Sequence, residues 1–441
     1  MVIRRLALSI AVVLGMGAAG FLSGTANAAS GGGGSGGSGQ FKNLKPVKAP
    51  SPCTNDPGVS DSEIKVGAIL PQSGPSAPSF AASEDGMRAR IDQANATGEL
   101  GKRKITLTVA DDGGDPARNV TAAQQLVEQN GVFGIIENSL AADASAKYLN
   151  QKGVPVTGWH LGLASFGTYP NMFGWRNSQP PDPATTFTNR DVLVLKMLGA
   201  SKIALVGANT SNSSTFINQI EQAVKMTPGM KVVYKTTDVS VSQRDFTAEA
   251  QKIKDSGADG LYTGMDFLQN VALSAALKQD NYSVKATVYP GGYDSRVTSL
   301  PGIDGVYFGL EVIPFEQNPP SYTAYKTAMQ KAGKFFQGEI PYIGWLSADT
   351  FIEGIKAAGT SCPTRKGFIA NLRLEKNWTA HGAFAPIDFT TIFGRPFYCT
   401  YYVQVQNGAF VPTFGGKPVC ASEVISGKKV TKLTAAQQAQ G

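Results

Sequence analysis

Short apolar runs typical of β-strands alternate with helical segments along this chain, and the alternation occurs twice. In the first series, Ile64–Leu70 and Ile105–Ala110 are strand-like, while apolar residues recur at helical spacing in Phe80–Asn95 and Ala117–Gln129. A further strand, helix and strand follow at Val132–Ile136, Ala141–Gln151 and Val154–Thr157. Regular alternation of this kind predicts an α/β fold with a parallel, doubly wound sheet.

The second series begins after the proline-rich segment Gln179–Pro183. It contains helical stretches and short strands at Asp191–Leu198, Ile203–Val206, Phe216–Met226, Val232–Tyr234, Phe246–Asp255, Gly260–Tyr262, Leu268–Lys278, Lys285–Tyr289 and Val306–Phe308. Three more helical stretches lie at Tyr322–Ala332, Ile343–Ala358 and Arg365–Leu372. They exceed what the second sheet needs, so we place them on the first lobe. Finally, Asn407-Gly408 predicts a type I′ hairpin turn, because both residues readily take positive φ.

We therefore expect two Rossmann-like lobes. Roughly 360 residues lie between residue 61 and the end of the second lobe, and one hydrophobic core rarely grows so large. The expected first lobe is 61–180 plus 312–387, the second is 181–311 plus 388–420, and 421–441 is a tail. Crossings near Asn177–Pro183, Glu311–Phe315 and Ala385–Phe389 would form the hinge. Open α/β sheets bind ligands outside the carboxyl ends of their strands, which predicts a ligand cleft there.

The first residues have the features of a signal peptide. Arg4 and Arg5 precede the apolar run Leu6–Gly20, which is shorter than a membrane span, and Ala26-Asn27-Ala28 is a small-x-small cleavage pattern. We expect cleavage of residues 1–28 and an exported chain in the periplasm, the cell envelope or outside the cell. General secretory and twin-arginine export both stay open. Residues 29–60, rich in Gly, Ser and Pro, are expected to be a flexible lead-in, and the Gly/Ser stretch is either native or an engineered spacer.

Composition excludes several classes of function. The formal net charge is +7. The net charge falls to about +5 without the two signal-peptide arginines, and the basic residues are dispersed along the chain. We therefore expect no nucleic-acid partner. Only two histidines and no CxxC pair are present, so a metal site is not expected. The nucleophile-elbow, P-loop, dinucleotide-binding and HExxH motifs are also absent. The sequence therefore predicts neither an enzyme nor a cofactor.

Four cysteines follow the signal peptide: Cys53, Cys362, Cys399 and Cys420. An even number in an exported protein favours two disulfides, and three connectivities are possible. We predict Cys53–Cys362 and Cys399–Cys420. A bond across the cleft would oppose its closure, and the hairpin at Asn407-Gly408 brings the second pair together.

Local strings strengthen this interpretation. The first is the opening strand and loop, Ile64–Pro75 (IKVGAILPQSGP). The others are Asp85-Gly86-Met87, Asp111-Asp112, Asp115-Pro116, Gly131–Ile136, Gly153–Val156 and Asp245-Phe246-Thr247. In order and spacing, from Asp61 to Phe414, they resemble the branched-chain amino-acid-binding family, the type I periplasmic receptors of ATP-driven importers. The resemblance implies a periplasmic binding protein type I fold, a monomer, a small-molecule ligand and an ABC permease as partner.

The resemblance also implies where a ligand is contacted. The family holds a carboxylate with a serine loop after the third strand, matched by Asn138-Ser139-Leu140, and with the loop after the fourth, matched by residues 158–162. Backbone N–H groups at helix N-termini favour such anions. Second-lobe contacts fall near residues 209–213, 265–267 and 289–294. The candidate ligand-binding residues are Ser73, Phe80, Ser139, Leu140, Trp159, His160, Leu161, Asn209, Asp266, Tyr289, Tyr293 and Asp294.

One departure from the family bears on the ligand. Its amino-acid binders place a glutamate beside the ligand ammonium, and the matching position here is Gly291. A buried ammonium without a carboxylate partner is costly, although Asp266 or Asp294 could take over. We therefore expect a ligand other than a simple branched-chain amino acid. Besides delivery to a permease, the sequence leaves open a sensor module for a membrane receptor and, less favoured, an enzyme on the same scaffold.

Overall fold

The structure is a computed structural model, and it describes residues 41, 43–160, 162–176 and 179–438. The expected signal peptide and the first part of the lead-in, residues 29–40, lie outside the described residues. Within the described part, no helix is long and apolar enough to cross a membrane.

The first sheet has five parallel strands in the order β2-β1-β3-β4-β5. They are β1 (Glu63–Leu70), β2 (Lys104–Asp111), β3 (Gly134–Glu137), β4 (Val156–Gly158) and β5 (Met172–Gly174). Strands β3 and β4 are completely buried, as expected for a parallel sheet covered on both faces. Since all five strands run in the same direction, their carboxyl ends meet at one edge.

Helices connect and cover these strands. They are α1 (Ala77–Phe80), α2 (Ser83–Thr97), α3 (Pro116–Gln124) with the π-helical turn η1 (Gln125–Gln129), α4 (Asp143–Gln151), α5 (Ser165–Thr168), α10 (Pro320–Lys331), α11 (Glu339–Ala358), α12 (Arg365–Leu372) and α13 (Phe389–Ile392). Local sequence sets their ends: the Asp115 side chain caps α3 by accepting from the Arg118 N–H, and Gly98 ends α2 with a left-handed φ of 70°.

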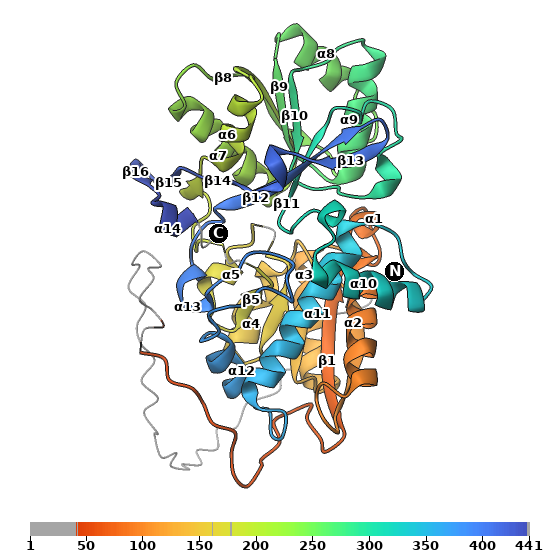
Figure 1. Cartoon of the computed structure of the whole chain (residues 1–441), viewed down its shortest axis with the longest axis vertical. Helices are drawn as coiled ribbons and strands as arrows, with labels where there is room; N and C mark the ends of the chain where they lie inside the picture. Colours follow the sequence, from red (N-terminus) through yellow and green to blue (C-terminus); the bar gives the residue numbers. More distant parts are fainter. Residues whose placement is uncertain (1–40, 42, 161, 177–178, 439–441) are drawn as a thin grey trace, which may run out of the picture. The chain divides into compact units, whose positions relative to one another are not determined.

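The long helix α11 packs closely against α2, on the same side of the molecule as the first sheet (Figure 1). Two glycines make this approach possible. A β-carbon on Gly86 would lie 1.7 Å from the Pro341 carbonyl oxygen, and one on Gly344 would lie 1.9 Å from the Ser83 carbonyl oxygen. Any larger residue would force the helices apart. The packing fixes the N-terminus of α11, which begins at Glu339.

The second sheet runs in the order β13-β12-β11-β10-β9-β7-β8. Its strands are β7 (Lys202–Ala208), β8 (Lys231–Val239), β9 (Gly260–Gly264), β10 (Ala286–Tyr289), β11 (Tyr307–Leu310), β12 (Cys399–Gln406) and β13 (Ala409–Pro412), with β14 (Val419–Cys420) paired to β12. The strands β7 to β11 are parallel, and β12 and β13 are an antiparallel hairpin. Asn407 and Gly408 have φ of 52° and 77°, which confirms the predicted turn. Two parallel-sheet lobes confirm the predicted fold class.

The helices of the second lobe are α6 (Arg190–Met197), α7 (Ser211–Met226), α8 (Thr247–Asp255) and α9 (Phe267–Gln279). Short 3-10 turns are η2 (Ser295–Val297), η3 (Phe315–Gln317) and η4 (Phe414–Gly416), and α14 (Ala435–Gln438) ends the described chain. The helices α7 and α9 begin directly after β7 and β9, so their N-termini lie at the carboxyl edge of the sheet.

The third crossing between the lobes lies later than the sequence analysis places it. Instead of leaving the first lobe at residues 385–389, the chain stays there through α13. The Phe389 ring packs against Phe173 of β5 with centroids 5.9 Å apart, and Phe393 stacks over the Arg373 guanidinium. Burial of these aromatic rings in the core of the first lobe keeps the segment there. The crossing to the second lobe therefore falls between Phe393 and Cys399. Residues 177 and 178 of the first predicted crossing lie outside the described residues.

The two segments outside the predicted lobes, the lead-in and the tail, are both attached to the rest of the described chain. The tail after residue 420 forms β15 (Glu423–Ser426) and β16 (Lys429–Lys432), which extend from β6 (Thr186–Thr188) as a three-stranded antiparallel sheet. Its anchor is the buried side chain of Ile425. The lead-in is likewise attached at Phe41, which is buried against Phe393, and at Val47, whose N–H donates to Asn371 Oδ1.

Both predicted disulfides are present, Cys53–Cys362 and Cys399–Cys420. The first bonds the lead-in to the segment between α11 and α12. The second joins β12 to β14, where the two cysteines face each other in the register of the pair. Each bond therefore lies within one lobe, which leaves the cleft free of covalent links.

Candidate functional site

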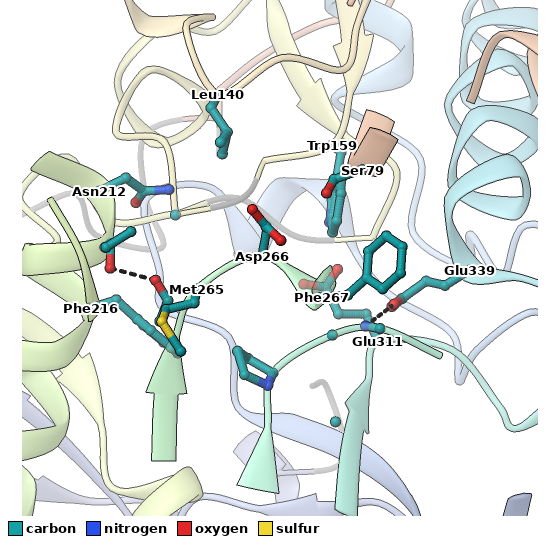
Figure 2. A pocket seen from close by; sticks show the side chains of 18 of the residues that line it. Ser79, Leu140, Trp159, Asn212, Phe216, Met265, Asp266, Phe267, Glu311 and Glu339 are labelled. Carbon is teal, nitrogen blue, oxygen red and sulfur yellow. Dashed lines mark hydrogen bonds between the residues drawn. The ribbon is translucent and has the colours of Figure 1, made fainter. Parts of the chain in front are cut away.

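A cavity of about 340 Å³ lies at the carboxyl ends of the strands of both sheets. Its first-lobe wall comes from α1 and from the loops after β3 and β4 (Figure 2). Its second-lobe wall comes from the N-termini of α7 and α9 and from the loops after β9 and β10, and Glu339 at the start of α11 contributes from a third direction. This is the place that the alternating pattern predicts for a ligand cleft.

Much of the wall is apolar. The apolar and aromatic side chains that face the cavity include Phe80, Leu140, Trp159, Phe216, Met265, Phe267, Ile340 and Phe397. Phe80 and Trp159 contact each other with ring centroids 5.8 Å apart and form a continuous aromatic surface in the first lobe. Leu140 and Trp159 lie on one side of the cavity, while Phe216, Met265 and Phe267 lie on the other (Figure 2). Such a lining suits the hydrocarbon part of a small organic ligand.

The second-lobe helices begin at side-chain caps. The Thr210 hydroxyl accepts from the Ser213 N–H at the start of α7, and Asp266 Oδ1 accepts from the Gln269 N–H, 3.0 Å away, at the start of α9. The Ser213 hydroxyl in turn donates to the Gly264 carbonyl oxygen, 2.5 Å away, and so ties α7 to β9. Asp266 also lines the cavity (Figure 2). One of its carboxylate oxygens caps α9, and the group as a whole lies beside the ligand space.

Two glutamates lie at the α11 side of the cavity. Glu339 is only 6% exposed, and the Gly292 N–H donates to its Oε2 across 3.4 Å (Figure 2). Burial, together with the negative charge of nearby Glu311, raises the pKa of Glu339 to about 8. The carboxyl group is therefore largely protonated at neutral pH when nothing cationic lies beside it.

His160 and Glu311 face each other across 3.5 Å between Nε2 and Oε2. Within the described part of the chain neither atom has a hydrogen-bond partner. Burial lowers the pKa of His160 below its ordinary value even though Glu311 opposes that shift, so the ring is neutral at pH 7. Its Nδ1 lies 3.1 Å from Gln179 Nε2, and Arg176 donates to the Glu311 carbonyl oxygen. The main chain of Glu311 is thus fixed, while its carboxylate is directed to the cavity wall.

The structure brings most of the predicted site residues to this cavity: Phe80, Leu140, Trp159, His160, Asp266, Tyr293 and Asp294. Two of these side chains, those of Tyr293 and Asp294, are bound to other residues of the chain. The Tyr293 hydroxyl donates to Glu316 Oε2 across 2.5 Å, and Asp294 forms an ion pair with Arg296 at 2.5 Å. Leu161 lies outside the described residues.

Four predicted site residues do not reach the described cavity wall. Ser73 is exposed and donates to Asp111 Oδ2, Asn209 is exposed beyond the end of β7, and the Tyr289 hydroxyl is buried beside Ser274 Oγ at 2.6 Å. Ser139 is fully buried, where its hydroxyl donates to Asp112 Oδ2 and accepts from the Ala141 N–H. For Ser73, Tyr289 and Ser139, a hydrogen bond within the protein holds the side chain away from the cavity.

Glu311 and Glu339 were missed by sequence reasoning. A glutamate in the first turn of a helix is an ordinary stabilising feature, since it complements the helix dipole, so Glu339 carries no signal of its own. Glu311 follows a short strand at a predicted crossing and was counted only as part of the hinge. As for metals, no group of three or more potential ligands occurs among the described residues.

Comparison with known proteins agrees with this geometry. Residues 63–409 match the family described as periplasmic binding protein. The Leu/Ile/Val-binding protein homolog 3 of Brucella melitensis is 25% identical over 209 residues, which cover 46% of this chain and 54% of that protein. This chain therefore spans about half the length of that curated relative.

Two solved structures share the fold. A branched-chain amino acid ABC transporter protein from Thermus thermophilus with bound valine aligns with a TM-score of 0.72 at 15% identity, covering 82% of this chain and 98% of the other. A fatty acid ABC transporter substrate-binding protein from Thermomonospora curvata aligns with a TM-score of 0.69 at 18% identity, covering 83% and 95%.

Two parallel-sheet lobes with a cavity at their carboxyl edges define a type I periplasmic binding protein. The chain belongs to the periplasmic binding protein family and is related to the Leu/Ile/Val-binding proteins of ABC transporters. The sequence analysis predicts a binding protein rather than an enzyme, and the family to which the chain belongs is one of binding proteins.

Proposed function

We propose that this chain is an exported receptor that binds one small organic molecule between its lobes and delivers it to an ABC permease. The cavity carries this proposal. Its volume of about 340 Å³ falls within the range of small-molecule sites, and both lobes contribute to its wall. A ligand that contacts both lobes stabilises the closed arrangement, which is the usual basis of hinge closure in binding proteins.

Two further features support export and closure. The disulfides Cys53–Cys362 and Cys399–Cys420 suit an oxidising compartment outside the cytoplasm. Each bond joins residues of a single lobe and neither links the two lobes, so the crossings between the lobes remain free to bend.

Native mass spectrometry of the chain purified without refolding tests the proposal. We expect a mass excess from a single small molecule, which denaturation releases. Gly291 offers a matched pair of variants, because a β-carbon there meets only ordinary van der Waals contact, 3.7 Å from Glu339 Oε2. Gly291→Phe should fill the cavity and abolish the mass excess, while Gly291→Ala should keep it. A mass excess retained in Gly291→Phe would place the ligand elsewhere.

Delivery is tested in the producing cells. Once the bound molecule is identified, its uptake should fall when the gene is deleted and recover with the wild-type chain but not with Gly291→Phe. Uptake that does not change on deletion would contradict a role in transport.

A further inference from the structure

Glu339 occupies the space that a side chain at position 291 would enter. A β-carbon on Gly291 would lie 3.7 Å from Glu339 Oε2, and apart from its two chain neighbours no other heavy atom of the described structure lies within 4 Å of it. The contact is held from both sides, since the Glu339 N–H donates to the Tyr293 carbonyl oxygen at 2.8 Å and the Gly292 N–H donates to Glu339 Oε2. A carboxyl group from α11 thus lies where the loop after β10 provides no side chain.

The charges around the cavity are unbalanced. Among the described residues no lysine lines it, and its two arginines are already in ion pairs, Arg190 with Asp191 and Arg296 with Asp294. By contrast, neither Asp266 nor Glu339 has a lysine or arginine within ion-pair distance in the described chain. Glu311 lies 3.5 Å from neutral His160, and its charge also interacts with that of the buried Arg176, which does not line the cavity. The described wall of the ligand space therefore has three acidic groups, Asp266, Glu311 and Glu339, and no lysine or arginine outside an ion pair.

Two polar atoms at the cavity wall face each other without forming a hydrogen bond. His160 is 1% exposed and lines the cavity, yet its Nε2 has no hydrogen-bond partner in the described structure. The same holds for Glu311 Oε2, 3.5 Å away. Leaving such groups unsatisfied is costly in a folded protein, so a donor group that enters the cavity would recover this loss at Glu311.

We propose that the ligand carries a protonated amine or amidine group, which binds between Glu339 and Glu311 while its apolar part lies against Phe80 and Trp159. This inference rests on the proposed function and adds the chemical class of the solute. Of the helix N-termini at the cavity, that of α9 is capped by the acidic side chain of Asp266 and that of α7 by the Thr210 hydroxyl, while α11 has the acidic Glu339 in its first turn.

Binding of such a cation should release a proton at neutral pH. Burial keeps Glu339 largely protonated in the free protein, and a cation beside it favours the ionised form. The charged groups packed around Glu339 are Glu311, with neutral His160 and the buried Arg176 behind it, and the Asp294–Arg296 ion pair next to Tyr293. The charge of Arg176 acts on Glu311, so none of these groups places a positive charge beside Glu339.

Calorimetric titration with three probes of similar skeleton tests the charge class: phenethylamine, phenethyl alcohol and 3-phenylpropionate. We expect the wild-type chain to bind phenethylamine at least about tenfold more tightly than either of the others, because a buried acid discriminates strongly by charge. Glu339→Gln should remove this preference and leave binding of the alcohol unchanged. The control is Glu353→Gln, the same substitution further along α11, where the side chain pairs with Lys356 instead of facing the cavity. It should behave as wild type.

Proton release provides the second readout, which a purely structural role of Glu339 would not affect. The binding enthalpy of phenethylamine at pH 7 should differ between Tris and phosphate buffers in wild type and in Glu353→Gln, but not in Glu339→Gln. Tightest binding of 3-phenylpropionate, no binding of phenethylamine, or an unchanged preference in Glu339→Gln would each overturn the inference. The proposed function would still stand if native mass spectrometry found a neutral or anionic molecule that Gly291→Phe excludes, and would fall only if no molecule bound in the cleft.

Discussion

The hydroxyl of Ser139 donates a 2.5 Å hydrogen bond to Oδ2 of Asp112, and both side chains are completely buried. Asn119 Nδ2 joins the same network by donating to Asp112 Oδ2 and to Glu137 Oε1, both at 2.9 Å. The hydroxyl thus supports the loop after β3 from below the surface, and we infer that its role is in stability rather than in ligand contact.

Ser139→Ala should therefore lower the free energy of unfolding by about 1–3 kcal/mol, because it removes one partner of a buried carboxylate. Ser73→Ala is the control, since Ser73 makes a similar bond to Asp111 at an exposed site and should change stability by less than about 0.5 kcal/mol. Urea denaturation measures both values. Equal effects of the two substitutions would contradict the assigned role.

The raised pKa of Glu339 makes the stability of the ligand-free chain depend on pH. Its folded value, about 8, lies above the ordinary glutamate value of 4.5, so the folded state holds a proton that the unfolded state loses. The resulting stability is complete below pH 4.5 and is lost as the pH rises through about 8. Glu339→Gln removes this dependence.

Between pH 5 and pH 9, the free energy of unfolding of Glu339→Gln should rise relative to that of wild type by at least about 1.4 kcal/mol. This amount corresponds to one pKa unit. Thermal or urea unfolding at both pH values measures the difference, with Glu353→Gln as the control that should follow wild type. A constant difference between Glu339→Gln and wild type across this range would show that the carboxyl group titrates normally.

The two disulfides should appear as two separate cross-linked peptides in non-reducing mapping, and recovery of a Cys362–Cys399 peptide would reject the pairing. They should also differ in their contribution. The loop closed by Cys53–Cys362 spans 309 residues and that closed by Cys399–Cys420 spans 21. On chain-entropy grounds, replacing the first pair by serine should cost about 6 kcal/mol and replacing the second about 3 kcal/mol. Urea unfolding of the two double variants measures both costs, and a larger loss from the second pair would contradict this order.

Leucine, isoleucine and valine should bind more weakly than about 10 µM. The sequence analysis reaches this expectation from Gly291 alone, but Glu339 restores an acid at that place. The stronger reason is the α-carboxylate of these ligands. It would lie among Asp266, Glu311 and Glu339, where the described cavity wall has no lysine or arginine outside an ion pair, and the serine expected to hold it, Ser139, is buried away from the cavity. An uncompensated charge pair of this kind costs about 2–5 kcal/mol. Calorimetric binding tighter than about 10 µM by any of the three would contradict the prediction.

The sequence predicts the fold well wherever one local signal decides the structure. Helix α12 begins and ends at the predicted residues, Arg365 and Leu372, because a Thr364 cap precedes it and an apolar stripe runs through it. The Asn407-Gly408 turn is correct for the same local reason. By contrast, β15 and β16 have only four residues each and depend on pairing with β6, which is far away in sequence.

The site is less predictable because its key contacts join distant segments. Gly291 and Glu339 lie side by side only because Gly86 of α2 and Gly344 of α11 let the two helices pack closely. No local sequence pattern around Gly291 or Glu339 indicates this contact. For Ser139, the resemblance places the residue in the correct loop. The direction of its side chain, however, depends on the buried Asp112, which belongs to a different strand connection.

Closure of the lobes around a ligand is the central claim, and single-molecule energy transfer between them tests it most directly. Dyes can be attached at Lys147→Cys on α4 and Lys225→Cys on α7, both exposed, because the chain's own cysteines are all in disulfides. With the molecule that co-purifies with the chain, the distance distribution should shift to a single shorter value, and in Gly291→Phe it should not change. An identical distribution with and without bound ligand in the wild-type chain would contradict the account.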